Sequence, residues 1–269
     1  MRKDKLREHI LLILLASAVG TTTMLAPKQA HPVGGISNSK VIVPNTETVQ
    51  KGRVEFEPFF GLSIADDRDD STEFESGTRL TFGLLDNLEV GVNLIYLTIS
   101  DSDKIESAEK EFGDTTAGFK IRLMDDDDNY PFSLAWQSGV TFPTSGDDAP
   151  WVYELGGLIL TKNVNERLSI DGDFVVGIVE GGEEPDAFIF NSEIGLGYYI
   201  THRFQTVLEM AYSLENPENE DNTSAFILTA GFTVQAGKIL TVIIGISQDI
   251  YTNNIDKQLT LTSAFTFLF

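Results

Sequence analysis

From Arg53 to the last residue, apolar side chains alternate with polar or small ones in twelve segments of about ten to thirteen residues. A period of two places the alternating side chains on opposite faces of a β-strand. Clusters of turn-forming residues separate the segments, and no stretch with helical periodicity interrupts them. The sequence therefore predicts an all-β protein with strands at 53–64, 72–84, 88–99, 112–124, 132–142, 151–162, 168–179, 187–200, 204–214, 224–236, 239–249 and 258–269.

The two faces of the predicted strands differ in a way that a soluble β-sandwich does not allow. One face carries charges in mid-strand, including Glu75, Lys120 and Asp171, so this face must meet water. The other face is rich in Phe, Leu, Ile, Val and Trp and requires either a second apolar layer of equal size or lipid. Trp136 and Trp151 belong to this apolar face.

The lengths of the connections decide between these two possibilities. Links after the even-numbered segments are short, such as "DN" at 86–87 and "GK" at 237–238, whereas those after the odd-numbered segments are longer and more polar. Eleven residues at ~3.3 Å each, tilted by about 40°, rise roughly 27 Å, close to the ~25 Å apolar band of membrane barrels. We therefore expect a transmembrane up-and-down antiparallel β-barrel of about twelve strands at 53–269, located in the bacterial outer membrane.

The N-terminus has the layout of an export signal. Basic residues precede an apolar core at 10–20, which is too short to span a membrane as a helix, and small residues follow it. Residues 1–30 are predicted to be this signal peptide. Residues 31–52 are interpreted as either a periplasmic tail or a plug inside the barrel.

Composition excludes several classes of function. The chain has 41 acidic and 19 basic residues, which argues against a nucleic-acid partner, and it has no cysteine. A hydrolase would need a histidine base, but His9 lies in the predicted signal, His31 precedes the barrel and His202 falls in a short turn. The acidic clusters at 66–70 and 183–186 lack the spacing of a calcium-binding loop. We therefore expect no enzyme activity, no cofactor and no structural metal site.

The charged face of the strands is predicted to line a lumen. Carboxylates outnumber cations there, so this face could be a paired network that fills the barrel or a pore with a negative field that attracts cations. The expected lumen-facing ionisable residues are Arg53, Glu55, Glu57, Glu73, Glu75, Arg79, Glu89, Asp114, Lys120, Arg122, Glu154, Lys162, Asp171, Asp173, Glu193 and Glu209.

Three stretches resemble a known family: "FGLLDNLEVGVNLIYL" at 82–97, "EFGDTTAGFKIRL" at 111–123 and "FSLAWQSGVTFPTSG" at 132–146. They are similar to the outer-membrane proteins named for the meta-pathway of phenol degradation, relatives of the long-chain fatty-acid transporters. Ile121 departs from the pattern, where an aromatic residue is expected. The resemblance implies a channel or transporter for small solutes, including hydrophobic or aromatic compounds. The alternative is a structural or adhesive barrel without transport.

The expected partners follow from this location. The apolar face would contact outer-membrane lipid, and the acidic loops would lie beside lipopolysaccharide. The terminal Phe269 resembles the C-terminal aromatic residue by which the outer-membrane assembly machinery recognises barrels. Small-molecule solutes would be the cargo.

Overall fold

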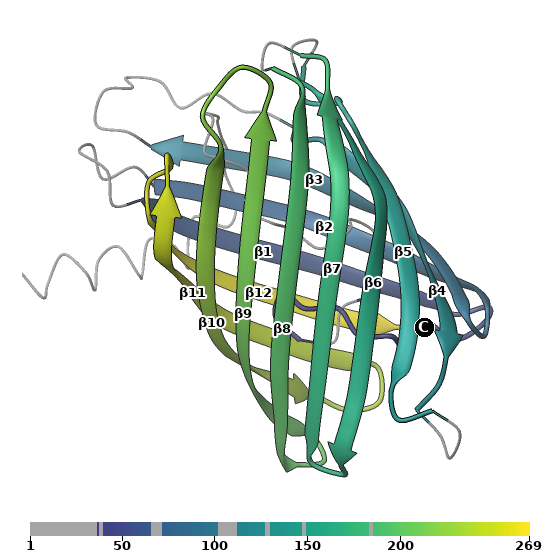
Figure 1. Ribbon diagram of the computed structural model, residues 1–269. Helices are drawn as coiled ribbons and strands as arrows, with labels where there is room; N and C mark the ends of the chain where they lie inside the picture. Colours follow the sequence, from purple (N-terminus) through teal and green to yellow (C-terminus); the bar gives the residue numbers. More distant parts are fainter. Residues whose placement is uncertain are drawn as a thin grey trace, which may run out of the picture.

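Twelve strands form one closed barrel in the computed structural model, which describes residues 37, 40–65, 72–101, 112–126, 130–146, 149–182 and 185–269 (Figure 1). Each strand pairs antiparallel with its sequence neighbours, and β1 pairs with β12 to close the barrel. The described residues contain no helix long and apolar enough to cross a membrane. The strands are β1 (Val54–Ala65), β2 (Thr72–Leu85), β3 (Leu88–Asp101), β4 (Thr115–Met124), β5 (Ser133–Phe142), β6 (Trp151–Asn165), β7 (Leu168–Glu180), β8 (Ala187–Thr201), β9 (Phe204–Pro217), β10 (Thr223–Gln235), β11 (Leu240–Asn253) and β12 (Gln258–Leu268).

The predicted fold class is confirmed, and each predicted strand overlaps one observed strand. Most bounds agree within one or two residues. The larger differences are a start of β4 at Thr115 instead of residue 112 and extensions, such as β9, which continues to Pro217, and β11, which continues to Asn253. In both extensions the strand runs beyond the alternating apolar residues into polar sequence, because ladder hydrogen bonds to the neighbouring strand continue there.

Backbone hydrogen bonds at the C-terminus complete the barrel. The amide of Phe269 donates to the carbonyl of Val54 (2.9 Å), and the amide of Val54 donates to the carbonyl of Phe269 (3.2 Å). The Phe269 ring stacks on the Phe267 ring, with their centroids 6.4 Å apart. The Phe267 centroid is in turn 6.1 Å from that of Phe56 on β1. Closure pairs the edge strands, which a hydrocarbon environment requires.

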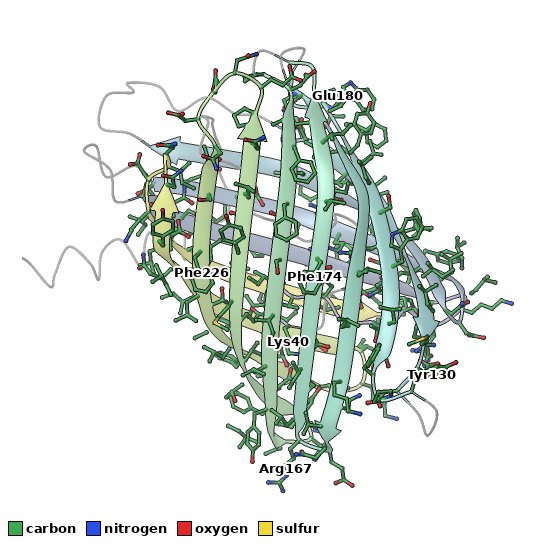
Figure 2. The ribbon with its side chains drawn as sticks, in the orientation of Figure 1. Lys40, Tyr130, Arg167, Phe174, Glu180 and Phe226 are labelled. Carbon is green, nitrogen blue, oxygen red and sulfur yellow. The ribbon has the colours of Figure 1, made fainter. Side chains whose placement is uncertain are left out.

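The outward face of the barrel is apolar and exposed. Large side chains such as Phe174, Leu196 and Leu261 stand 40–49% exposed on it, and Phe174 is labelled on the barrel wall in Figure 2. The predicted outward aromatic residues Trp136 and Trp151 are also exposed. An apolar band around a closed antiparallel barrel is stable only in lipid, as in bacterial outer-membrane proteins. The protein is therefore an outer-membrane barrel.

The two rims of the barrel differ. Both β1 and β12 have their chain ends at the rim that carries the short turns, which faces the periplasm in barrels of this class. Arg167 lies in one of these turns, and Glu180 ends β7 at the opposite rim (Figure 2). The predicted signal peptide, the acidic cluster at 66–70 and residues 183–184 of the second cluster lie outside the described residues.

Candidate functional site: the lumen and the segment inside it

A segment that precedes β1 lies within the periplasmic end of the barrel. We call residue 37 and residues 40–52 the inner segment. Its buried residues include Val41, Val43 and Val49, although it belongs to no strand or helix. It contacts inward-facing residues of strands β2, β3, β4, β6, β7 and β9 to β12, as the following paragraphs describe. The segment therefore touches most of the circumference of the lumen.

A buried ion pair holds both ends of the inner segment. Glu89 of β3 and Lys120 of β4 are opposite each other in register, 3.2 Å apart between Oε1 and Nζ, and 0% exposed. Glu89 accepts hydrogen bonds from the backbone amides of Ser37 (2.8 Å) and Val49 (2.6 Å). Lys120 donates to the carbonyls of Ser37 and Asn45, each at 3.1 Å. Each partner thus satisfies the other's charge and also binds the segment's backbone.

Lys40 anchors the segment to β7. Its ammonium group forms an ion pair with Asp171 of β7 and donates to Ser169 Oγ (3.2 Å). Burial lowers the pKa of Lys40 to about 8, while the charges of Glu209 and Glu47 oppose this shift. Figure 2 labels Lys40 over the barrel wall, between the heights of Phe174 and of Arg167 at the periplasmic rim.

Two further polar contacts come from β9 and β6. Glu209 accepts hydrogen bonds from the amides of Ile42 (3.2 Å) and Val43 (3.1 Å). Thr161 accepts one from the amide of Thr46 (3.0 Å) and donates to Asp171 (2.6 Å). The backbone of the inner segment, which lacks secondary structure, thereby finds its hydrogen-bond partners on the barrel wall.

Glycines on the inner wall make room for the segment. Gly231 of β10 and Gly245 of β11 are opposite each other in register. The three atoms nearest to a Cβ at Gly245 would all belong to Val41, with Cγ1 at 2.5 Å and Cβ at 3.2 Å. A Cβ at Gly83 would collide with the backbone of Val49 and Gln50. These positions admit the segment only because they carry no side chain.

Apolar side chains of the segment pack on apolar parts of the lumen wall. Val41 contacts a cluster formed by Ile243 and Ala264, with Phe59 packed against it. Ile42 packs against that cluster and also against a second one. The second cluster consists of Ala211, Ala225 and Ile227. The segment therefore covers apolar surface that would otherwise face the water of the lumen.

The other predicted lumen residues lie at several depths. Glu57 pairs with Arg79 (2.9 Å) and accepts a hydrogen bond from Thr266, and Glu55 on the same strand is half-buried. Glu73 and Glu75 are half-buried toward the outer end of β2, and Asp173 and Glu193 are buried at mid-wall. Each of these side chains is on an inward-facing position of its strand, and their role in conduction stays a prediction.

Four of the predicted residues lie at the rims. Asp114 precedes β4 and accepts hydrogen bonds from the amide and hydroxyl of Ser145 at the outer rim. At the periplasmic rim, Arg122 pairs with Asp125 (3.1 Å) and Lys162 pairs with Asp126 (2.8 Å), while Arg53 is exposed. The hydrogen bond from Lys162 lowers the pKa of Asp126. These charges border the lumen without reaching its middle.

Several residues of the site carry no sequence signal of their own. Gln137, Thr161 and Ser169 are buried on the inner wall, and Lys40 lies in a segment without periodicity. The alternation along the strands places Gln137 and Thr161 on the inward face. They were not among the expected site residues because only ionisable residues were considered there. Within the described ranges, no group of three or more His, Cys, Asp or Glu side chains is placed to hold a metal ion. His202, the one histidine among the described residues, is exposed in the turn between β8 and β9.

Comparison with known proteins identifies the fold. No protein-family model matches the sequence, and no curated protein matches it. The structure is similar to the COG4313 outer membrane channel from Pseudomonas putida F1, with a TM-score of 0.67 and 12% identity over 83% of this chain and 98% of that chain. It is also similar to the NanC porin (TM-score 0.53, 8% identity, 79% of this chain and 98% of that chain). The KdgM porin gives a TM-score of 0.51 at 9% identity, over 78% of this chain and 98% of that chain.

At these identities the likeness concerns the fold alone. The similar structures are outer-membrane barrels, which agrees with the fold described above. They are described as a channel and as porins. The finer resemblance to the meta-pathway family of phenol degradation has no matching family model behind it.

Proposed function

We propose that this protein is an outer-membrane channel for small solutes and that the inner segment closes its periplasmic end. The observation that carries this proposal is the binding of one segment by side chains around most of the lumen. Because the segment belongs to no strand, it can leave the lumen without breaking the strand ladder. Its displacement would open a polar path through the barrel.

The lining favours cations among charged solutes. The carboxylates of Glu73, Glu75 and Glu193 face the lumen, and the Glu89–Lys120 pair contributes no net charge. Carboxylates along a narrow water-filled path attract cations and repel anions. The described lumen therefore supports a cation-preferring channel.

Hydrophobic or aromatic solutes form the finer part of the proposal. With the inner segment displaced, the apolar clusters that contact Val41 and Ile42 would become free to contact a solute. The wall would then offer apolar patches between polar groups, as small-molecule sites generally do. Uptake of phenol by liposomes that contain the protein tests this part, with protein-free liposomes correcting for passive permeation.

The alternative function is a structural or adhesive barrel that transports nothing. The buried Glu89–Lys120 pair and the glycine contacts favour it, since they would also hold a permanently closed barrel rigid. Planar-bilayer recording from the full chain separates the two functions. Discrete current steps support a channel, whereas a silent bilayer that contains correctly folded protein supports the structural barrel.

We also propose that Phe269 is the group by which the assembly machinery recognises this chain. Its side chain is 63% exposed and stacked near Phe267 at the periplasmic rim. Phe269→Ala retains the backbone hydrogen bonds to Val54. A normal amount of Phe269→Ala barrel in outer-membrane fractions would refute the proposal.

A further inference from the structure

Three carboxylates occupy the inner wall on neighbouring strands. Asp173 of β7 and Glu193 of β8 are opposite each other in register, and Glu154 lies on β6, the other neighbour of β7. The charge of Asp173 acts on both Glu154 and Glu193. All three side chains are buried. We call these residues, together with Gln137 of β5, the carboxylate cluster.

The cluster contains acceptor atoms that the described part of the chain leaves without a hydrogen-bond partner. They are Oε2 of Glu154, Oε2 of Glu193 and Oε1 of Gln137. Gln137 is 0% exposed, and its Nε2 donates to both carboxylate oxygens of Asp173 at 2.9 Å, so its free oxygen belongs to the same site. Buried polar atoms nearly always have a partner. The cluster is therefore short of donors and of positive charge.

The nearby cations are engaged elsewhere. Lys40 is paired with Asp171 and Ser169, and Lys120 is bonded to Glu89 and to the inner segment. Lys120 acts on Asp173 only through space. Burial of several carboxylates without a paired cation is costly, so the site favours the arrival of a cation from outside.

The spacing of the carboxylates indicates what kind of cation fits. The described residues hold no acidic group arranged as a metal site, and the cluster extends over four adjacent strands, with Glu154 opposite Gly177 of β7 and therefore offset along the strand from Asp173. A guanidinium or ammonium group presents several N–H donors in different directions and can bridge acceptors at such spacing. The donor-poor cluster therefore matches an organic cation better than a bare metal ion.

The position of the cluster relates it to the inner segment. Along β7, Ser169 and Asp171 hold Lys40, and Asp173 is the next inward-facing residue toward the outer rim. The cluster thus lies beside the docked segment, one inward-facing position farther from the periplasmic rim than the partners of Lys40. We propose that the carboxylate cluster is a binding site for solutes that carry a guanidinium or primary ammonium group. This proposal rests on the proposed channel function and names the substrate class of its lumen.

Calorimetry on the detergent-solubilised full chain tests the site, with agmatine as the probe and butylurea as an uncharged analogue. We expect agmatine to bind and butylurea not to bind. Asp173→Asn and Glu193→Gln should each weaken agmatine binding about tenfold or more, because each removes a charge-assisted hydrogen bond. Glu166→Gln, which removes an acid from an exposed turn at the periplasmic rim, should leave binding unchanged.

Binding is compared only among variants that fold, which a heat-dependent shift in gel mobility shows. If Asp173→Asn or Glu193→Gln does not fold, Glu154→Gln is measured in its place. Absence of agmatine binding, equal binding by the cluster variants, or equal binding of butylurea would overturn the proposal. Displacement of agmatine by equimolar Mg²⁺ would overturn it in favour of an inorganic cation. Since binding is measured without a current, a protein that binds agmatine but does not conduct would refute the channel and retain the site.

Discussion

Glu89 and Lys120 face each other across β3 and β4 with no exposure to solvent, and both bind the backbone of Ser37 or its hydroxyl group. The pair therefore does more than neutralise two charges within the wall. It connects the barrel to a segment whose Ser37 and Val49 lie 52 and 40 residues before Glu89 in the sequence. The stability of the pair and the closure of the lumen should consequently change together.

Removal of one partner of this pair should destabilise the protein strongly. Glu89→Gln leaves the ammonium of Lys120 buried without a counter-charge, and such a loss costs about 3–5 kcal/mol. Urea titration in lipid vesicles should show this decrease in the free energy of unfolding. Conductance should rise in the same variant, because the amides of Ser37 and Val49 lose a charged acceptor.

The double variant Glu89→Gln/Lys120→Met provides the control. It contains no unpaired charge, so its loss of stability should be smaller than the sum of the two single losses. Additive losses would show that the two side chains do not interact as the structure indicates.

Gly245→Ala should displace the inner segment. The new methyl group would lie 2.5 Å from Cγ1 of Val41, and the three atoms nearest to it would all belong to that side chain. Overpacking of this kind costs about 1–3 kcal/mol, which the segment relieves by moving while the strands stay in place. Single-channel recording should show larger or more frequent openings than in the natural chain.

Gly61→Ala is the matched control for this substitution. Gly61 also lies on an inward-facing position, but its added methyl group would meet only Glu75 Cβ, at 4.0 Å. Its conductance should equal that of the natural chain. Equal conductance in Gly245→Ala and the natural chain would show that Val41 does not obstruct the current.

Strand parity explains why the barrel could be predicted in detail. Alternation is a local property, so the pattern around Leu259, Leu261 and Phe265 fixes both the strand and its outward face without reference to the rest of the chain. Lumen-facing charges such as Asp171 and Glu209 follow from the same parity. The sequence could not predict the position of the inner segment, because its hydrogen bonds to the wall join residues as far as 167 positions apart and it has no periodicity.

The sequence also could not distinguish the roles of individual lumen-facing carboxylates. Glu89 and Glu75 have the same strand parity and were expected to act alike on permeating cations. In the structure Glu89 is engaged with Lys120 and the inner segment, whereas Glu75 is half-buried near the outer end of β2. The difference arises from partners contributed by distant parts of the chain.

Closure should strengthen as the pH rises above neutrality. Burial lowers the pKa of Lys40 from 10.5 to about 8, so between these values the docked segment binds fewer protons than the displaced one. Raising the pH through this range favours the state with fewer protons, by at most about 3 kcal/mol. Open probability should therefore fall between pH 7 and pH 10.

Lys40→Met isolates this effect, since Asp171, Glu209 and Glu47 remain around the position. In that variant the open probability should be nearly independent of pH over the same range. A natural chain that opens more as the pH rises would contradict the assignment of Lys40.

Glu75 should contribute to cation preference. A unit charge at about 8 Å in water stabilises a cation and destabilises an anion by about 0.5 kcal/mol each, so Glu75→Gln should lower the cation-to-anion permeability ratio by up to about fivefold at low salt. The reversal potential in a KCl gradient measures this ratio. Glu166→Gln, in an exposed turn at the periplasmic rim, should have a smaller effect, and anion preference in the natural chain would contradict the proposed lining.

A reversible cross-link between the inner segment and the wall tests the closed lumen most directly. The chain has no cysteine, and a Cβ at position 245 would lie 3.2 Å from Cβ of Val41, near the range that a disulfide spans. Bilayer currents through Val41→Cys/Gly245→Cys should be compared before and after addition of dithiothreitol. Low conductance that rises on reduction is the predicted result, whereas a disulfide-linked barrel that conducts as well as its reduced form would show that the inner segment does not close the channel.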